Sequence, residues 1–351
     1  MPGIFNLRPH SPQPLTINQP TDYAPHANRP MPDKTADRRR FLAAAAATAS
    51  APALLANPPR ASASPAPLTA PADFPKLRYC LNTSTIKIGK HPVREQIKIA
   101  ADAGYDAVEL WLRDISVFTE AGGKLSDLKK EIADLGLTVD SAIAFGSWIA
   151  NDDAQRQKGL EQCKRDMAIV KAIGGGRIAA PPSGGTKGDL DLSAAAERYH
   201  TLCEVGKSEE VLAQLELWGF SENLSTLAEV LYIAAASKHP NACILLDVYH
   251  MYKGGDDFEA IGLVPGQMMH CMHMNDYPAQ PPRPAIKDEH RVFPGDGIAP
   301  ISKILRSLVA GGFDGTLSLE LFNREYWDRP AEEVAATGLA KMKACVAAAF
   351  A

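Results

Sequence analysis

Between Leu77 and Phe350, short apolar runs alternate with amphipathic stretches of helical length, and this alternation repeats eight times. The pattern is typical of parallel strand–helix units, because helices cover such strands on the sheet faces. Eight units in 274 residues suit a (β/α)8 barrel, which needs about 250 residues. A doubly wound open sheet would give similar local patterns, but no Gly-x-Gly-x-x-Gly follows the first run. The sequence therefore predicts an α/β fold, with one TIM barrel over residues 76–351.

The individual elements can be placed from the same runs. The expected strands are Leu77–Leu81, Ala107–Leu110, Thr138–Ile143, Arg177–Ala180, Leu212–Leu217, Cys243–Leu246, Met268–His273 and Thr316–Leu319. The expected helices include Pro92–Ala103, Leu125–Leu135, Gln155–Ile173, Thr226–Ala236 and Pro330–Ala349. Pro92 and Pro330 suit the first turns of their helices, and Gly104 and Gly136 suit helix ends.

Residues 1–75 differ from the rest of the chain in composition. They hold 15 of the 27 prolines and show no periodicity, which is typical of a segment that stays disordered. Within them, Arg38-Arg39-Arg40-Phe41-Leu42 and the alanine-rich run after it resemble a twin-arginine export signal. We therefore expect a disordered head with this signal, the twin-arginine export machinery as a partner, and a periplasmic location.

The charge balance excludes one class of partner. The chain carries 37 Lys and Arg against 41 Asp and Glu, a net charge of −4. Residues 1–70 contribute +4, so the remainder of the chain carries −8. An acidic body offers no electrostatic surface for nucleic acid, which argues against a DNA-repair endonuclease.

Charged or ionisable side chains end four successive expected strands: Glu216, Asp247, His273 and Glu320. A charge at the end of a buried strand is costly unless it is paired or bound to a metal. The carboxyl ends of all barrel strands lie on one face, so these four should converge there, although separate salt bridges at the rim are the alternative. Three carboxylates and one imidazole suit Mn²⁺, Mg²⁺, Co²⁺ or Zn²⁺, and one divalent ion is expected.

Several motifs in the last third of the chain are those of a known family. They are Leu-Leu-Asp247-Val-Tyr-His250, His273-Met-Asn-Asp276, Asp288-Glu-His-Arg291-Val-Phe-Pro294-Gly295-Asp-Gly297 and Ser318-Leu-Glu320-Leu-Phe-Asn-Arg-Glu325-Tyr326-Trp. With these motifs, residues 77–349 resemble the xylose-isomerase-like TIM barrels, the sugar isomerase/epimerase superfamily. Within this family the chain is most similar to the 2-keto-myo-inositol isomerases.

The resemblance implies roles for particular residues. The divalent cation would be held by Glu216, Asp247, His273 and Glu320. His250 would touch substrate oxygens, and Arg291 would bind the carbonyl end of the substrate. Moving a carbonyl along a polyol requires removal of a proton next to C=O, through an enediolate that a metal ion stabilises. Carboxylates on the two sides of the substrate can serve as base and acid, which is the role expected of Glu216 and Glu320.

Other residues near the expected strand ends leave alternatives open. Glu109 ends the second strand and could either orient a ligand or form an ion pair with Arg113. Trp218, as a substrate contact, is expected to form an apolar wall with Phe145 and Trp148, although aromatic residues near strand ends are as often part of the core.

Two long loops interrupt the compact rhythm of the units. They span Pro181–Asp191 and Asp276–Pro300, and the second contains six prolines. Long loops after barrel strands usually build the active site, so we expect the second loop to cover it.

Three classes of function follow from these observations. The expected one is a metal-dependent isomerase or epimerase of a keto-polyol, ketose or inosose. A dehydratase or lyase of a keto-sugar or inosose would begin with the same proton removal, and a non-catalytic sugar-binding barrel is the third class. The substrate partner is a small sugar or cyclitol, while a homo-oligomer and the identity of the metal stay open.

Overall fold

The computed structural model describes residues 76–86 and 90–351. The chain divides into two units, residues 1–67 and 68–351. The expected disordered head and its twin-arginine signal lie outside the described residues. Within the described ranges, no helix combines the length and the apolar character needed to cross a bilayer.

Eight strands form the central sheet. They are β1 (Arg78–Asn82), β2 (Ala107–Trp111), β3 (Thr138–Ile143), β4 (Arg177–Ala180), β5 (Leu212–Glu216), β6 (Cys243–Asp247), β7 (Met269–Met274) and β8 (Thr316–Leu319). Each one begins and ends within one residue of its predicted range. All the pairings are parallel, and the α/β fold class is confirmed.

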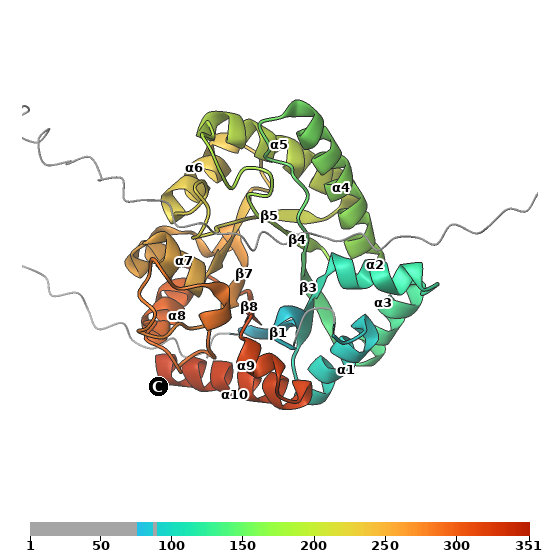
Figure 1. The fold of residues 1–351 in the computed structure, drawn as a ribbon, viewed down its shortest axis with the longest axis vertical. Helices are drawn as coiled ribbons and strands as arrows, with labels where there is room; N and C mark the ends of the chain where they lie inside the picture. The colour runs from blue at the N-terminus through green and yellow to red at the C-terminus, as the bar shows by residue number, and fades with distance from the viewer. Residues whose placement is uncertain (1–75, 87–89) are drawn as a thin grey trace, which may run out of the picture. The chain divides into compact units, whose positions relative to one another are not determined.

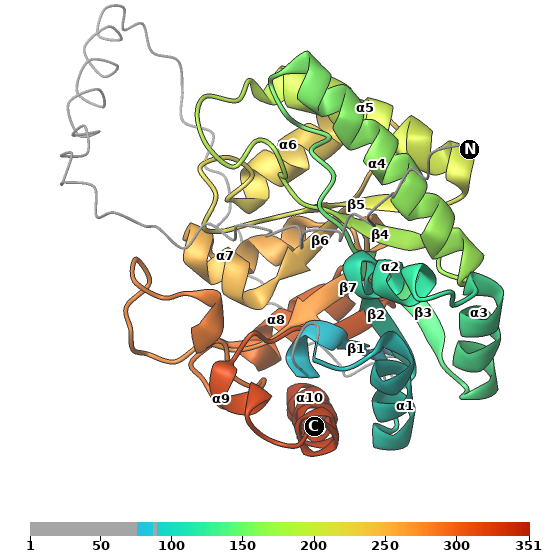
Figure 2. The ribbon, with the colours of Figure 1, turned by 45° about the vertical axis from the view of Figure 1, so that its right-hand side comes forward.

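The sheet curls into a nearly closed barrel. The hydrogen-bonded order is β3-β2-β1-β8-β7-β6-β5-β4, so the first and last strands of the chain lie side by side at its centre. The two ends of this order, β3 and β4, are also in contact. Helices surround the strands in Figure 1, and Figure 2 shows α10 (Ala331–Phe350) beside α1 (Val93–Ala103), where the last unit meets the first. The carboxyl ends of all eight strands therefore share one face.

The helices follow the strands in the expected alternation. Besides α1 and α10 they are α2 (Leu112–Glu120), α3 (Leu125–Asp134), α4 (Asp153–Ala172), α5 (Leu192–Glu209), α6 (Leu227–Ser237), α7 (Val248–Gly254), α8 (Ile301–Ala310) and α9 (Arg324–Trp327), with 3-10 helices at Thr83–Ile86, Phe258–Leu263, Gly266–Met268 and Asp288–His290. The expectation that Pro92 and Pro330 lie in first turns is wrong by one residue. Both are N-caps with extended backbone, at ψ 147° and 131°. Gly104 ends α1 as expected, in the left-handed conformation at φ 88°.

Apolar side chains fill the space on both sides of the strands. The larger cluster lies between strands and helices and includes Leu81 of β1, Ile97 of α1 and Leu339 of α10. A small second cluster consists of Ile143, Ala179, Leu245 and Cys271 on the opposite strand faces, because successive side chains of a strand alternate. All six cysteines are free. The barrel interior is thus packed below the strand ends, and the polar groups gather above it.

One buried carboxylate in the helical layer gives a pH-dependent stability. Asp166 in α4 is 5% exposed, and burial raises its pKa from 3.8 to about 6 although Gln162 donates a hydrogen bond to it. The folded state binds this proton more tightly than the unfolded state does. Ionisation of Asp166 therefore lowers the free energy of unfolding as the pH rises from about 4 to about 6, and this loss of stability remains at higher pH. We expect Asp166→Asn to stabilise the fold, by about 1 kcal/mol more at pH 8 than at pH 5.

Urea unfolding at the two pH values measures this difference. Glu161→Gln, an exposed change on the same helix, is the matched control and should give the same small effect at both. A pH-independent effect of Asp166→Asn would contradict the assignment.

Candidate active site and its metal-ligand cluster

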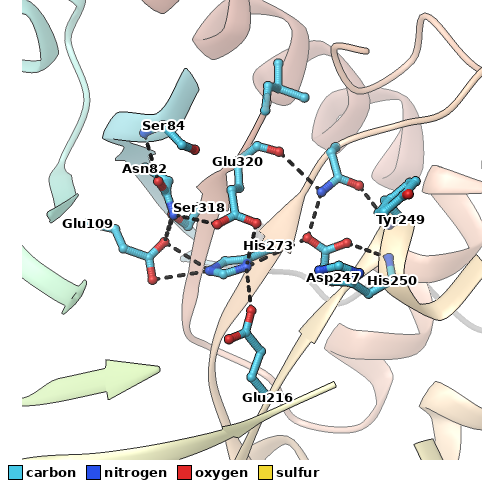
Figure 3. A network of polar contacts seen from close by, with 12 residues as sticks. Asn82, Ser84, Glu109, Glu216, Asp247, Tyr249, His250, His273, Ser318 and Glu320 are labelled. Carbon is cyan, nitrogen blue, oxygen red and sulfur yellow. Dashed lines mark hydrogen bonds and ion pairs between the residues drawn. The ribbon is translucent and has the colours of Figure 1, made fainter. Parts of the chain in front are cut away.

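Four side chains at successive strand ends meet above the barrel interior. Glu216 and Asp247 end β5 and β6, His273 is in β7, and Glu320 directly follows β8. None of them is more than 4% exposed. Figure 3 shows the carboxylates of Glu216 and Glu320 approaching the His273 ring from opposite sides. The structure thus places all four residues singled out in the sequence around His273, but only Asp247, His273 and Glu320 form a group with metal-ligand spacing, and Glu216 lies outside it. Their assignment as metal ligands stays a prediction.

The Nδ1 atom of His273 is the centre of this cluster. It lies 3.2 Å from Oε2 of Glu320, 3.7 Å from Oδ2 of Asp247 and 3.9 Å from Oε1 of Glu216. Yet among the residues that the structure describes, none forms a hydrogen bond with this buried nitrogen. Burial alone would lower the pKa of His273, but the carboxylates, Glu320 foremost, raise it well above its usual value. The cluster therefore favours a positive charge at Nδ1, which is what a divalent cation would supply there.

The donor atoms also fit a divalent cation by type and position. Ligand atoms of Asp247, His273 and Glu320 all lie within 4.8 Å of one another. A second group, Glu109 with Cys271 and His273, meets the same distance condition. Burial raises the pKa of the Cys271 thiol well above its usual value, so it stays protonated and is a poor ligand. The carboxylate-rich group is the better metal site.

Glu109 orients His273 rather than facing Arg113. It is fully buried, and its Oε1 lies 3.2 Å from Nε2 of His273. Its Oε2 accepts hydrogen bonds from Asn82 Nδ2 at 2.9 Å and Ser318 Oγ at 2.7 Å. Arg113 pairs with Asp114 instead, so the expected alternative of a Glu109–Arg113 ion pair is wrong. Because Glu109 keeps a proton on Nε2, the lone pair of Nδ1 stays available on the side of the ring that faces the other carboxylates.

Asn82 is a site residue that the sequence interpretation missed. Its Nδ2 also donates to Oε1 of Glu320 at 3.0 Å, and its Oδ1 accepts from Trp111 Nε1 at 2.9 Å. Asn82 ends β1, and the signal in the sequence that marks it is a polar residue at the end of an apolar run. The Asn82 amide therefore donates hydrogen bonds to both Glu109 and Glu320.

We expect Glu109→Gln to weaken metal binding by about 10- to 100-fold, because the neutral amide no longer fixes the proton of His273 on Nε2. Calorimetric titration with Mn²⁺ or Zn²⁺ measures the affinity. Glu120→Gln, an exposed change at the end of α2, should leave it unaltered. An affinity equal to that of the wild type would show that Glu109 does not position His273.

Arg291 contacts both the carboxylates of the cluster and His250, the other residue expected to bind the substrate. It is 1% exposed, and its Nη1 donates to Asp247 Oδ2 and Glu320 Oε2, both at 2.9 Å. Its Nη2 lies 3.0 Å from Nε2 of His250. Burial lowers the pKa of His250 to about 3, so this imidazole is neutral and accepts the hydrogen bond. The rings of Tyr249 and Phe322 lie 4.5 and 5.0 Å from the guanidinium carbon.

The environments of Glu216 and Glu320 differ. Burial raises the pKa of Glu216 well above its usual value, with Glu320 adding to the shift. Burial alone would do the same to Glu320, but His273 and Arg291 hold its pKa well below its usual range. Two carboxylates with opposite shifts on the two sides of one site are a common arrangement for acid and base catalysis.

Of the three expected wall residues, only two lie at the mouth. Trp218 follows β5 and Phe145 follows β3, and their ring centroids are 6.1 Å apart. Trp148 is wrong as a wall residue: it is 1% exposed, donates to the Pro181 carbonyl and packs on Tyr199. Its indole is held in the core because burial of the N–H demands a partner, which this carbonyl provides.

The long loop after β7 is anchored by Asp276. This buried carboxylate accepts hydrogen bonds from four backbone N–H groups, those of Tyr277, Gly295, Gly297 and Ala299. A Cβ on Gly297 would lie 2.3 Å from Oδ1 of Asp276, so only glycine fits there. The Pro294–Gly297 motif is therefore the structural anchor of the loop that carries Arg291.

Comparison with known proteins gives relatives along most of the barrel. A sequence model of the xylose isomerase-like TIM barrel family matches residues 97–345. The 3-dehydroshikimate dehydratase of Pseudomonas putida is 24% identical over 246 residues, and the match spans 70% of this chain but 38% of that relative. The inosose isomerase of Bacillus velezensis is 23% identical over 290 residues, 78% of this chain and 99% of the relative. A crystal structure of the IolI protein with a bound zinc atom superposes with a TM-score of 0.73 at 21% identity, covering 78% of this chain and 100% of that one.

Proposed function

The chain belongs to the xylose isomerase-like TIM barrel family, and we propose that it is a divalent-metal-dependent isomerase or epimerase of a keto-polyol, ketose or inosose. The observation that carries this proposal is the cluster around His273. A buried Nδ1 without a hydrogen-bond partner in the described part of the chain faces three carboxylates at the carboxyl end of a barrel. A small polyol with a ketone beside a hydroxyl has the oxygen pair that such a cluster can receive.

Glu216, Asp247, His273 and Glu320 would hold the cation. When bound, the ion would stabilise the negative charge that develops on the ketone and hydroxyl oxygens of the substrate. Glu216 and Glu320 lie on opposite sides of His273, so a proton taken from one carbon by one glutamate can be returned to the neighbouring carbon by the other. Their opposite pKa shifts support unequal roles for them.

Arg291 and His250 would position the substrate. Arg291 keeps its charge because its acidic neighbours raise its pKa further, against the effect of burial, and it would donate to the carbonyl oxygen. Neutral His250 would contact a hydroxyl. Trp218 would cover the sugar ring from the rim, and Glu109 would act through His273 rather than on the substrate.

A dehydratase of a keto-sugar or inosose is the second candidate. It is favoured by the match to the P. putida protein, which is named a 3-dehydroshikimate dehydratase. The reaction would use the same proton removal, followed by departure of a hydroxyl group instead of return of the proton.

The two candidates differ in what happens in D₂O. We would determine the metal content of the purified protein by elemental analysis and then follow ketoses, inososes and 3-keto-glycosides by NMR. Deuterium at carbon with an unchanged composition supports the isomerase or epimerase, while loss of water with new ultraviolet absorbance supports the dehydratase. A fully metal-loaded protein that neither exchanges deuterium into any compound nor removes water from one would refute both and leave a sugar-binding barrel.

We also propose that the protein is exported. The support is the twin-arginine pattern at Arg38–Leu42, and the twin-arginine machinery would be the export partner. Fractionation of cells that express the full chain tests this, with recovery in the cytoplasm alone as the contrary result.

A further inference from the structure

Most of the hydrogen-bonding capacity of Arg291 is already used within the protein. A guanidinium group carries five N–H donors. Nη1 of Arg291 donates to Oδ2 of Asp247 and to Oε2 of Glu320, both at 2.9 Å. Nη2 donates to Oδ1 of Asp288 at 2.5 Å and to Nε2 of His250 at 3.0 Å. Each of these two nitrogens has two hydrogens and two acceptors, so neither has a donor left for a substrate.

One N–H group of Arg291 stays available for a ligand. Its Nε is buried and forms no hydrogen bond with any residue of the described ranges. His250 offers a second single donor: its Nε2 accepts from Arg291, so the proton of this neutral ring is on Nδ1, which is also buried and without a partner there. Single N–H groups on two different residues suit a ketone oxygen and a hydroxyl group. The fork of two parallel N–H groups with which an arginine binds a carboxylate or phosphate is not available.

The charge around Arg291 is also unfavourable for an anion. The cluster contains four buried carboxylates, those of Glu109, Glu216, Asp247 and Glu320, and Asp288 adds a fifth beside the guanidinium. The positive charges are that guanidinium and, when the metal is bound, one divalent cation. Negative groups outnumber the positive charges even if Glu216 holds a proton, so the site as a whole repels an anionic ligand.

Two further cations adjoin the loop that carries Asp288, and both have partners. The ammonium group of Lys253 has three hydrogens and donates to three backbone carbonyls at 2.9 to 3.1 Å, those of Arg283, Pro284 and Ile286. Arg324 forms an ion pair with Glu289 at 3.0 Å. Neither cation therefore compensates for the negative charge of Asp288 at the site.

Asp288 differs in exposure from the other acidic partners of Arg291. Its side chain is 40% exposed, whereas those of Asp247 and Glu320 are 0% and 5% exposed. It begins the 3-10 helix Asp288–His290, on the long loop after β7. Asp288 is therefore the carboxylate beside Arg291 that an entering ligand can reach.

We propose that Asp288 is a specificity-determining residue that restricts the site to uncharged substrates, such as unphosphorylated ketoses and inososes, and excludes keto acids and sugar phosphates. This inference rests on the proposed function and narrows its substrate class. Asp288 acts in two ways: it occupies a donor of Arg291, and it places a negative charge next to the guanidinium. Its removal would give Nη2 a free N–H in addition to that of Nε, and an acidic group needs two such donors.

Pairs of an acid and its primary amide test the inference, because the two have the same shape and differ in charge. We would measure by calorimetry the affinities of 3-dehydroshikimate and D-fructuronate, each beside its primary amide, for the metal-loaded protein. The wild type should bind each amide at least about tenfold more tightly than the acid. Asp288→Ala should reduce this preference about tenfold and change the amide affinities less than about threefold. Asp288→Asn, which keeps an acceptor oxygen for Nη2, should have an intermediate effect.

Glu289→Gln is the matched control. It removes the same charge from the neighbouring residue, whose side chain is 37% exposed and pairs with Arg324 rather than Arg291, so it should preserve the preference for the amides. An equal effect of Glu289→Gln and Asp288→Ala would overturn the inference, because net charge alone would then set the preference.

Deuterium exchange with the ketoses and inososes tests the proposed function separately. A preference for the amides that Asp288→Ala reduces supports the inference even if no compound exchanges deuterium, in which case only the proposed function is contradicted. Equal or tighter binding of the acids by the wild type would overturn the inference, whether or not exchange occurs. Absence of binding by both amides would overturn it too, because an uncharged ketone with neighbouring hydroxyl groups is the ligand that it requires.

Discussion

Glu320→Gln is expected to lose both bound metal and turnover, with kcat falling by about 10³-fold or more. Its Oε2 lies 3.2 Å from His273 Nδ1 and accepts a hydrogen bond from Arg291. The amide has nearly the same shape but no charge, so it removes one of the negative groups that favour a cation at this nitrogen. It also removes a proton-transfer group from one side of the site.

Metal content after dialysis and deuterium exchange with the best substrate measure the two losses. Glu325→Gln is the matched control, because Glu325 lies five residues later and is exposed. It should keep full metal content and activity, and circular dichroism should show that both variants are folded. Full turnover by Glu320→Gln would contradict the assignment of the cluster as the metal and proton-transfer site.

Asp276→Ala should lower the free energy of unfolding by about 3–5 kcal/mol. The carboxylate is 1% exposed and accepts four backbone hydrogen bonds, at 2.8 to 3.1 Å. Without it, N–H groups of Tyr277, Gly295, Gly297 and Ala299 lose their acceptor. The loop that carries Arg291 then loosens, so turnover should fall as well.

Urea unfolding at pH 7 measures the loss of stability. Asp296→Ala is the control in the same loop: Asp296 is exposed and forms a surface ion pair with Lys341, so its removal should cost under about 1 kcal/mol. Asp276→Asn should lie between the two, because one side-chain oxygen is retained. If Asp276→Ala unfolds at the same urea concentration as the wild type, the four hydrogen bonds do not stabilise the loop.

Most of the barrel was predictable from local patterns. The length of an apolar run, the proline before a helix and the glycine after it are properties of a few neighbouring residues, and they place each strand to within one residue. The convergence of Glu216, Asp247, His273 and Glu320 was also predictable. In a parallel barrel, a residue at the carboxyl end of any strand points to the same face, whatever its distance along the chain.

The partners of the site residues were not predictable in this way. Asn82 contacts Glu109 and Glu320, which are 27 and 238 residues away, and no local pattern marks these contacts. Trp148 was expected at the mouth, but the carbonyl of Pro181, 33 residues away, holds it in the core. Asp276 was visible within a motif, yet its acceptor role depends on how the following loop returns to it.

From sequence alone, the eight strands, the face at which they end and the ionisable groups at those ends could be derived, because each depends on local periodicity and on the geometry common to parallel barrels. Which nitrogen of His273 faces the carboxylates, which acids Arg291 pairs with and which aromatic rings stay exposed depended on the tertiary structure. Side-chain orientation follows from packing and hydrogen bonding between segments that are distant in the chain, and these are fixed only when the barrel closes.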